Sequence, residues 1–193
     1  MLDLGTSFLA SVARDPDALA LVDGDLRFTY AQWLRKISAL VAAFDRMGLK
    51  PGDHLLTALQ NNWQAASVHW ACQLAGLIIT PVNWRVKADE LDFCIENSES
   101  RALVYQDVSG GAVATSIRAP DLIVMRAGST SVGAGEVSLD ALFTRRPQAD
   151  EAEIRDLLTG HLCRCTGYAP VVKAALEAAA ELRGETKREA VDA

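Results

Sequence analysis

The 193-residue sequence lacks the features that mark secretion, membrane insertion or nucleic-acid binding. Residues 1–10 contain no basic stretch followed by a long apolar run, so we expect no signal peptide. No run reaches the roughly 20 consecutive apolar residues that a membrane-spanning helix needs. Lysine and arginine number 19 against 25 aspartate and glutamate, a net charge of −6, which argues against nucleic acid and anionic membranes as partners. We therefore expect a cytoplasmic protein.

Cysteine is also scarce, with four residues in the chain. Without a secretory signal, these cysteines are expected to be reduced thiols rather than a disulfide framework. Cys72 and Cys94 lie inside amphipathic patterns, where a free cysteine usually packs as a small hydrophobic residue. Cys163 and Cys165 are separated by a single residue, so both sulfurs can face the same metal, and thiolates are the usual ligands of iron–sulfur clusters.

The first part of the sequence carries clear local signals. Two apolar runs, 18–22 and 26–29, flank Asp23-Gly24-Asp25, which predicts a β-hairpin. Thr29 then has the position of a helix N-cap, with Gln32 as its capping-box partner. The following helix has one apolar stripe with three- and four-residue steps, and Gly48 supplies its left-handed end. The stripe consists of Tyr30, Trp33, Leu34, Ile37, Leu40, Val41, Phe44 and Met47.

Beyond this helix, strand and helix patterns alternate, which favours an α/β fold with a parallel sheet. The apolar run 77–82 is continuous, so we expect a strand that is covered on both faces. A loop is expected at 128–135 because glycine and serine dominate it. The expected strands are 54–59, 77–82, 101–105 and 121–125, and the expected helices are 63–75 and 87–98.

Most of the chain, from about residue 6 to residue 146, resembles the N-terminal part of adenylate-forming enzymes, the AMP-dependent acyl-CoA synthetase family. The likeness rests on a series of short segments in the same order and spacing. They are Phe28-Thr29-Tyr30, Gly48-Leu49-Lys50-Pro51-Gly52-Asp53, Asn61-Asn62, Ala75-Gly76, Pro81-Val82-Asn83-Trp84-Arg85 and Glu90-Leu91. Asp140-Ala141-Leu142-Phe143 also looks like the acidic, leucine-rich helix that this family places before its phosphate-binding loop.

This resemblance implies an acid–CoA ligase that uses ATP and CoA. Such enzymes need a Ser/Thr/Gly-rich loop that ends in Pro-Lys-Gly, an acidic residue for magnesium, an aspartate for the ribose and a lysine from a C-terminal domain. None of these is found in the 193 residues, so no catalytic or cofactor-binding residue is assigned. Residues 128–135 are the only candidate phosphate cradle, because backbone N–H groups can bind anions. Without a lysine, a plain surface loop is the alternative.

A second resemblance begins close to residue 147. His161-Leu162-Cys163-Arg164-Cys165-Thr166-Gly167-Tyr168 looks like the second cysteine pair of the 2Fe-2S helical domain in molybdenum hydroxylase small subunits. This family includes xanthine dehydrogenase and carbon monoxide dehydrogenase. His161 is a departure, since the family usually has asparagine there. The resemblance implies a helical hairpin, electron transfer and a molybdenum-binding large subunit as partner.

A 2Fe-2S cluster needs four protein ligands, and the sequence supplies only Cys163 and Cys165 at suitable spacing. Cys72 and Cys94 are too far apart in the sequence to imitate the missing C-x-x-C pair. Two free thiols are therefore one interpretation. A zinc site with His161, or a site shared by two chains in a self-dimer, is another.

Three further candidates come from residue type alone. Asn83-Trp84-Arg85 follows a strand, where α/β folds often bind ligands, although a loop that merely packs Trp84 fits equally well. His54 and His69 have no recognisable serine or cysteine nucleophile.

We predict an incomplete adenylate-forming α/β domain at 1–146, a partial 2Fe-2S helical domain at 147–183 and a polar tail at 184–193. Three functions compete. They are an acid–CoA ligase, an iron–sulfur electron-transfer subunit, and a chain that is a remnant or interaction module without catalysis of its own. The ancestral acid substrate and the oligomeric state do not follow from the sequence.

Overall fold

The computed structural model describes residues 4–129 and 132–144, which belong to the first of two units of the chain, residues 1–145. The predicted helical hairpin and tail therefore lie outside the described residues. The strands are β1 (Leu19–Asp23), β2 (Leu26–Thr29), β3 (His54–Ala58), β4 (Ile78–Pro81), β5 (Ala102–Gln106), β6 (Ile123–Ala127) and β7 (Glu136–Ser138). The helices are α1 (Leu4–Arg14), α2 (Tyr30–Arg46), α3 (Trp63–Ala75), α4 (Ala88–Ser98), α5 (Gly110–Thr115) and α6 (Leu139–Thr144), with short 3₁₀ turns η1 (Asp107–Ser109) and η2 (Ala119–Asp121).

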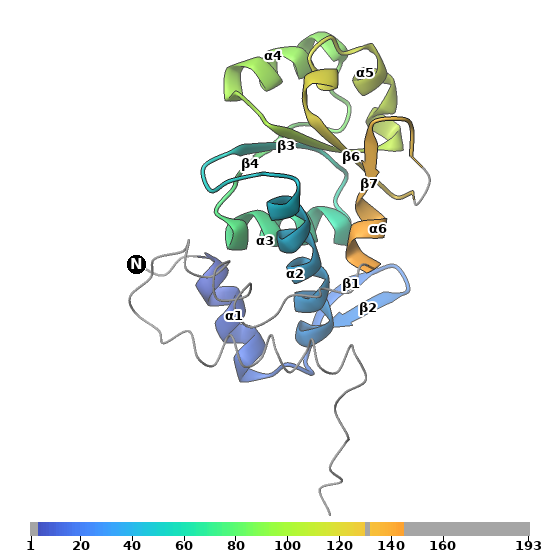
Figure 1. The fold of residues 1–193 in the computed structure, drawn as a ribbon. Helices are drawn as coiled ribbons and strands as arrows, with labels where there is room; N and C mark the ends of the chain where they lie inside the picture. The colour runs from blue at the N-terminus through green and yellow to red at the C-terminus, as the bar shows by residue number, and fades with distance from the viewer. Residues whose placement is uncertain (1–3, 130–131, 145–193) are drawn as a thin grey trace, which may run out of the picture. The chain divides into compact units, whose positions relative to one another are not determined.

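Five strands form a parallel sheet in the order β4-β3-β5-β6-β7, which confirms the predicted fold class. Figure 1 shows α2, α3 and α6 on one face and α4 and α5 on the other. Successive strand residues alternate between two cores: Leu55 packs with α2 and α3, whereas Leu56 packs with α4. Since both faces are covered, four of the five residues of β3 and four of the five residues of β5 are buried.

The N-terminus of α2 confirms the predicted capping box. Gln32 donates its backbone N–H to the Thr29 side chain at 3.2 Å, and its own side chain accepts the Thr29 N–H at 3.0 Å. At the other end, Gly48 has φ +82°, and Leu49 donates its N–H to the carbonyl of Phe44 at 3.1 Å. This pairing is a Schellman motif, in which a left-handed glycine lets the chain turn back and satisfy a free helix carbonyl.

The hairpin β1–β2 is also confirmed, with Asp23 paired to Leu26 around the two-residue loop. Asp23 has a second contact that the sequence pattern does not reveal. Its carboxylate accepts the N–H of Trp63 at 2.8 Å, and Trp63 is the first residue of α3. The carboxylate thus satisfies a free N–H of the helix and lies where the helix dipole favours negative charge.

The strand predicted at 77–82 differs from the expectation. It forms, as β4, but it is an edge strand of the sheet, and Ile78 is 46% exposed. Continuous apolar sequence therefore does not mean burial on both faces here. The sequence pattern also missed α1, α5 and β7, which are short or have few buried residues; only Gly5, Phe8 and Val12 of α1 are buried.

Within residues 4–129 and 132–144, no helix has the length and apolar character needed to cross a membrane.

Candidate functional site

The carboxyl ends of β3 and β5 meet where the chain connections diverge to opposite faces of the sheet. The chain leaves β3 towards α3 on one face and leaves β5 towards α5 on the other face (Figure 1). Ligands of open α/β sheets bind at such points. Here Gln60, which follows β3, donates its N–H to the side-chain oxygen of Gln106 at 2.6 Å. The Ser109 hydroxyl bonds the carbonyl of Ala58 at 3.2 Å and that of Trp84 at 2.7 Å. These contacts within the chain join the segments at the carboxyl ends of β3, β4 and β5.

Asn83, Trp84 and Arg85 follow β4 and form a compact turn. The Asn83 side chain accepts the N–H of Arg85 at 2.9 Å, and the Arg85 guanidinium lies 3.7 Å from the centre of the Trp84 ring. The half-buried indole is thus covered by its own neighbour. This geometry fits the interpretation of a loop that packs Trp84, because the cation that could bind a ligand already stacks on the ring.

The glycine-rich connection between β6 and β7 is held at its start by Asp140 of α6. One carboxylate oxygen accepts the N–H of Gly128 at 2.6 Å, and the other accepts the side-chain amide of Gln64 at 3.2 Å. Gly128 has φ +86°, a conformation that glycine adopts without strain. The backbone donor that would approach a phosphate is therefore engaged by an acid of the same chain.

Glu136 holds the end of this connection in the same way. One of its oxygens accepts the N–H of Gly133 at 3.1 Å, and the other accepts the hydroxyl of Tyr105 at 2.6 Å. Burial, followed by the bond to Glu136, raises the pKa of Tyr105 to about 12. Tyr105 is thus a hydrogen-bond donor at neutral pH, and the Glu136 carboxylate accepts hydrogen bonds from both Tyr105 and Gly133.

Arg126 is the basic residue next to this connection, and it is also paired. Its guanidinium donates to the carboxylate of Asp107 at 2.6 Å. The Asp107 carboxylate raises the pKa of Arg126, and the Arg126 bond lowers the pKa of Asp107. The candidate phosphate cradle therefore has two engaged N–H donors and a neutralised cation, as expected for a structural loop.

Lys36 is a residue that sequence reasoning missed. Its ammonium lies 5.2 Å from the ring centre of Phe28, 5.3 Å from Trp63 and 5.9 Å from Phe143. These rings belong to β2, α3 and α6, so a single cation joins three elements to α2. Burial lowers the pKa of Lys36, and the charge of Asp140 opposes this shift. No sequence pattern reveals this cluster, because its members are far apart in the chain.

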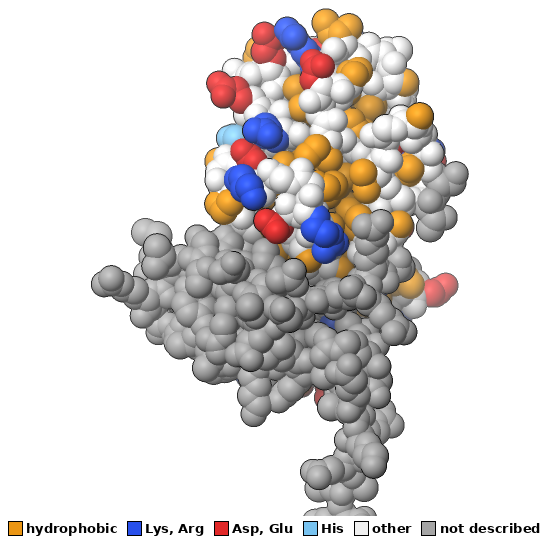
Figure 2. All heavy atoms as spheres, viewed as in Figure 1, with side chains coloured by type: hydrophobic (Ala, Val, Ile, Leu, Met, Phe, Trp, Pro, Cys, Tyr) orange, Lys and Arg blue, Asp and Glu red, His pale blue; other side chains and the backbone are white. Residues whose placement is uncertain are grey.

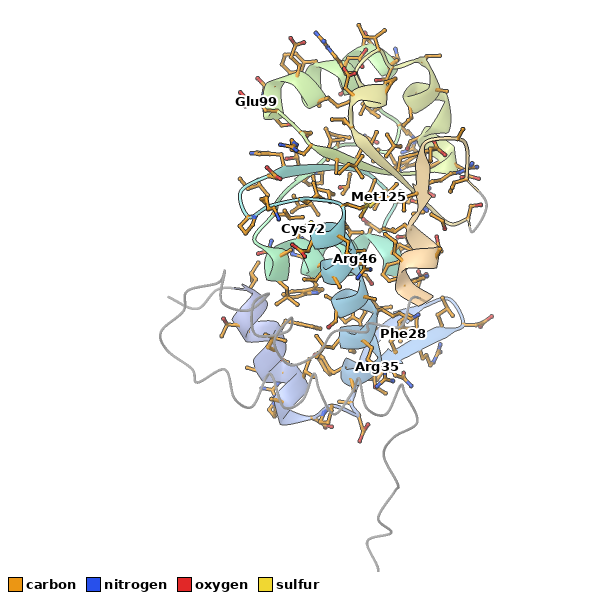
Figure 3. The ribbon with its side chains drawn as sticks, viewed as in Figure 1. Phe28, Arg35, Arg46, Cys72, Glu99 and Met125 are labelled. Carbon is orange, nitrogen blue, oxygen red and sulfur yellow. The ribbon has the colours of Figure 1, made fainter. Side chains whose placement is uncertain are left out.

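The cysteines and histidines of the described part carry no metal site. Cys72 is fully buried, as predicted; it belongs with Met125 to the core between the sheet and α3, and both are labelled in Figure 3. Burial raises the pKa of the Cys72 thiol to about 12. Cys94 is half-buried beside the second core. Among residues 4–129 and 132–144, no group of three or more His, Cys, Asp or Glu residues could hold a metal ion.

The two histidines make ordinary contacts. A ring nitrogen of His54 lies 3.2 Å from the Thr80 hydroxyl, between β3 and β4, and the His69 ring lies edge-on to Trp70 at 5.6 Å. Cys163 and Cys165, the predicted metal ligands, lie outside the described residues, as does His161.

Comparison with known proteins shows the family. The model of the AMP-binding enzyme family matches residues 8–182, and the chain belongs to this family. Fatty acid–[acyl-carrier-protein] ligase ScoC of Streptomyces coeruleorubidus is 27% identical over 125 residues, which are 65% of this chain and 24% of ScoC. Salicylyl-CoA synthase of a Streptomyces species is 31% identical over 94 residues, which are 49% of this chain and 17% of that enzyme.

Solved structures of ligases share the fold. The anthranilate CoA ligase AuaEII, in complex with anthranoyl-AMP, superposes with a TM-score of 0.68 at 15% identity, over 74% of this chain and 28% of AuaEII. The benzoate CoA ligase of Burkholderia xenovorans LB400 gives 0.65 at 11% identity, over 74% of this chain and 28% of that enzyme. The chain thus spans only part of its relatives' length, 17% to 49% for the curated ones.

These comparisons confirm the predicted likeness to AMP-dependent acyl-CoA synthetases. The family match also extends across Cys163 and Cys165. None of the relatives and structures named above is described as an iron–sulfur protein.

Proposed function

We propose that this chain is a partial acid–CoA ligase module that does not activate carboxylic acids as a chain of 193 residues. The observation that carries the proposal is the state of the glycine-rich connection after β6. Its Gly128 and Gly133 donors bond Asp140 and Glu136, and the neighbouring Arg126 bonds Asp107. Adenylation depends on groups that position the phosphates and neutralise their charge, and the described residues do not fit ATP at this loop.

Membership in the AMP-binding family supports the ligase half of the proposal. The names of the relatives refer to fatty, salicylic, anthranilic and benzoic acids. This range favours no single acid class for the present chain, so the proposal names only carboxylic acids.

Pyrophosphate exchange into ATP tests the proposal. The purified 193-residue chain is assayed with magnesium and a panel of aliphatic and aromatic acids, beside an intact acid–CoA ligase as positive control. We expect exchange with the control and none above background with this chain. Acid-dependent exchange by the chain, with a rate proportional to its concentration, would overturn the proposal.

An iron–sulfur electron-transfer function remains the second candidate, because of the Cys163-Arg164-Cys165 segment. The described residues do not supply the other half of a four-thiolate site, since Cys72 is buried and Cys94 is on another helix. We therefore propose that any metal is bound by two chains together, at one site per two chains. A molybdenum hydroxylase large subunit is the alternative partner.

Anaerobic reconstitution with iron and sulfide, followed by size-exclusion chromatography with metal analysis, tests this candidate. We expect metal only in a dimeric fraction and its loss in Cys163→Ser and Cys165→Ser. Cys94→Ser is the matched control and should keep the metal. A monomer with a full cluster would contradict the shared site.

A further inference from the structure

The two most exposed large apolar side chains of the described residues belong to two segments that are hydrogen-bonded to each other. Phe93 on α4 is 66% exposed, and Ile117, in the turn after α5, is 76% exposed. Asp92, the residue before Phe93, bonds the backbone of this turn directly. Figure 2 shows apolar side chains among charged ones at the end of the molecule that carries α4 and α5. Single exposed apolar residues are ordinary, whereas adjacent ones within a polar rim are typical of interaction sites.

The turn that presents Ile117 is rigidly held. The Asp92 carboxylate accepts the Ser116 hydroxyl at 2.5 Å, the Ile117 N–H at 3.2 Å and the Arg118 N–H at 3.1 Å. One helical turn further on, Glu96 pairs with the Arg118 guanidinium at 3.4 Å. Because these bonds already fix the backbone, a partner that covers Ile117 has little ordering cost to overcome.

The charge around Phe93 selects the kind of partner. The stretch 87–101 and the turn 116–121 together contain six acidic residues and three basic ones, so their net charge is 3 − 6 = −3. Asp89 and Glu90 are exposed on α4 with Phe93, and so is Glu96, which pairs with Arg118. Two copies of this surface would bring acid against acid, which disfavours a homodimer here. A basic segment instead meets complementary charge.

We propose that the surface formed by Phe93, Ile117 and the acidic rim of α4 binds a basic segment of a partner protein. Apolar side chains of that segment contact Phe93 and Ile117, and its lysine or arginine residues face Asp89 and Glu90. The site lies on the face of the sheet opposite α2, α3 and α6 and does not depend on the proposed ligase function.

Fluorescence anisotropy with a labelled, synthetic amphipathic peptide of leucine and lysine tests the proposal on the 193-residue chain. A matched peptide with glutamate in place of lysine is the charge control. We expect the lysine peptide to bind, and Phe93→Ser and Ile117→Ser each to weaken binding by about tenfold or more, as truncation of a central contact does. Ile78→Ser, at the exposed edge strand β4, should leave binding unchanged. Circular dichroism verifies that each variant is folded.

Several results would overturn the proposal. They are failure of the lysine peptide to bind, equal binding of the glutamate peptide, and equal losses in the Ile78→Ser control. A concentration-dependent increase in mass that Phe93→Ser abolishes would also contradict it, because the surface would then bind a second copy of the chain.

Discussion

The packing of Trp33 leads to a quantitative prediction about α2. Trp33 is only 7% exposed and lies edge-on to Phe8 at 5.4 Å and to Trp70 at 6.5 Å. Its ring N–H donates to the hydroxyl of the fully buried Ser67 at 2.8 Å. Trp33→Ala removes the ring and leaves a cavity beside two other rings, so we expect a loss of about 3–5 kcal/mol of unfolding free energy.

Milder substitutions in and before α2 test the separate contributions to its stability. Trp33→Phe keeps an aromatic ring but removes the N–H donor. Because Ser67 still donates to the carbonyl of Trp63 at 2.6 Å, we expect the lost hydrogen bond to contribute about 0.5–1.5 kcal/mol to the total cost. Thr29→Ala removes the cap of the same helix and should cost about 1 kcal/mol. Thr29→Ser keeps the capping hydroxyl and serves as the matched control.

Urea unfolding followed by circular dichroism measures these differences, since Trp33 itself contributes to the fluorescence. We expect the unfolding free energy to be highest for the wild type, lower for Thr29→Ala and lowest for Trp33→Ala. The m values should be unchanged. A larger loss from Thr29→Ala than from Trp33→Ala would refute the reasoning, because the buried stripe of α2 would then face solvent.

Other perturbations have equally definite outcomes. Burial raises the pKa of Cys72 from 9.0 to about 12, so this thiol holds its proton more tightly in the folded state than in the unfolded state. Stability should therefore fall between pH 9 and 12, by at most about 1.4 kcal/mol per pH unit from this group, and Cys72→Ala should reduce that slope in urea melts. Asp140→Ala leaves the buried Gln64 amide without its acceptor and should cost about 1–3 kcal/mol, measured by thermal unfolding. Asp92→Ala releases the turn at Arg118, so trypsin should cleave there faster than in wild type.

Features of the fold that depend on neighbouring residues could be predicted from the sequence. The capping box of Thr29, the glycine ends of α2 and α3, and the hairpin before α2 all formed as expected. Each depends on contacts within a few residues, which the order of side chains fixes directly. The alternation of strands and helices likewise determines a parallel sheet, because each crossover helix must cover one face of it.

Features that depend on distant pairs could not be predicted. The edge position of β4 depends on which strands lie beside it, and its sequence reads the same in a central strand. Asp140 and Gln64 are 76 positions apart, and Tyr105 and Glu136 are 31 positions apart. The acids that hold the glycine-rich connection are therefore invisible to a motif search, which sees only its glycines.

The N–H donors of Gly128 and Gly133, in the glycine-rich connection between β6 and β7, already have acceptors within the chain. Glycine composition predicts exposed N–H donors, but each donor has room for one good acceptor, and Gly128 already bonds Asp140 at 2.6 Å. A phosphate at the same donor would have to displace a carboxylate that remains nearby. Two like charges about 4 Å apart repel by about 4 kcal/mol near a protein surface, roughly half of the 8 kcal/mol that micromolar binding requires. Neutralisation by a cation could offset this cost, but Arg126 is paired with Asp107. We therefore expect the acids that hold Gly128 and Gly133 to disfavour nucleotide phosphates at these two donors.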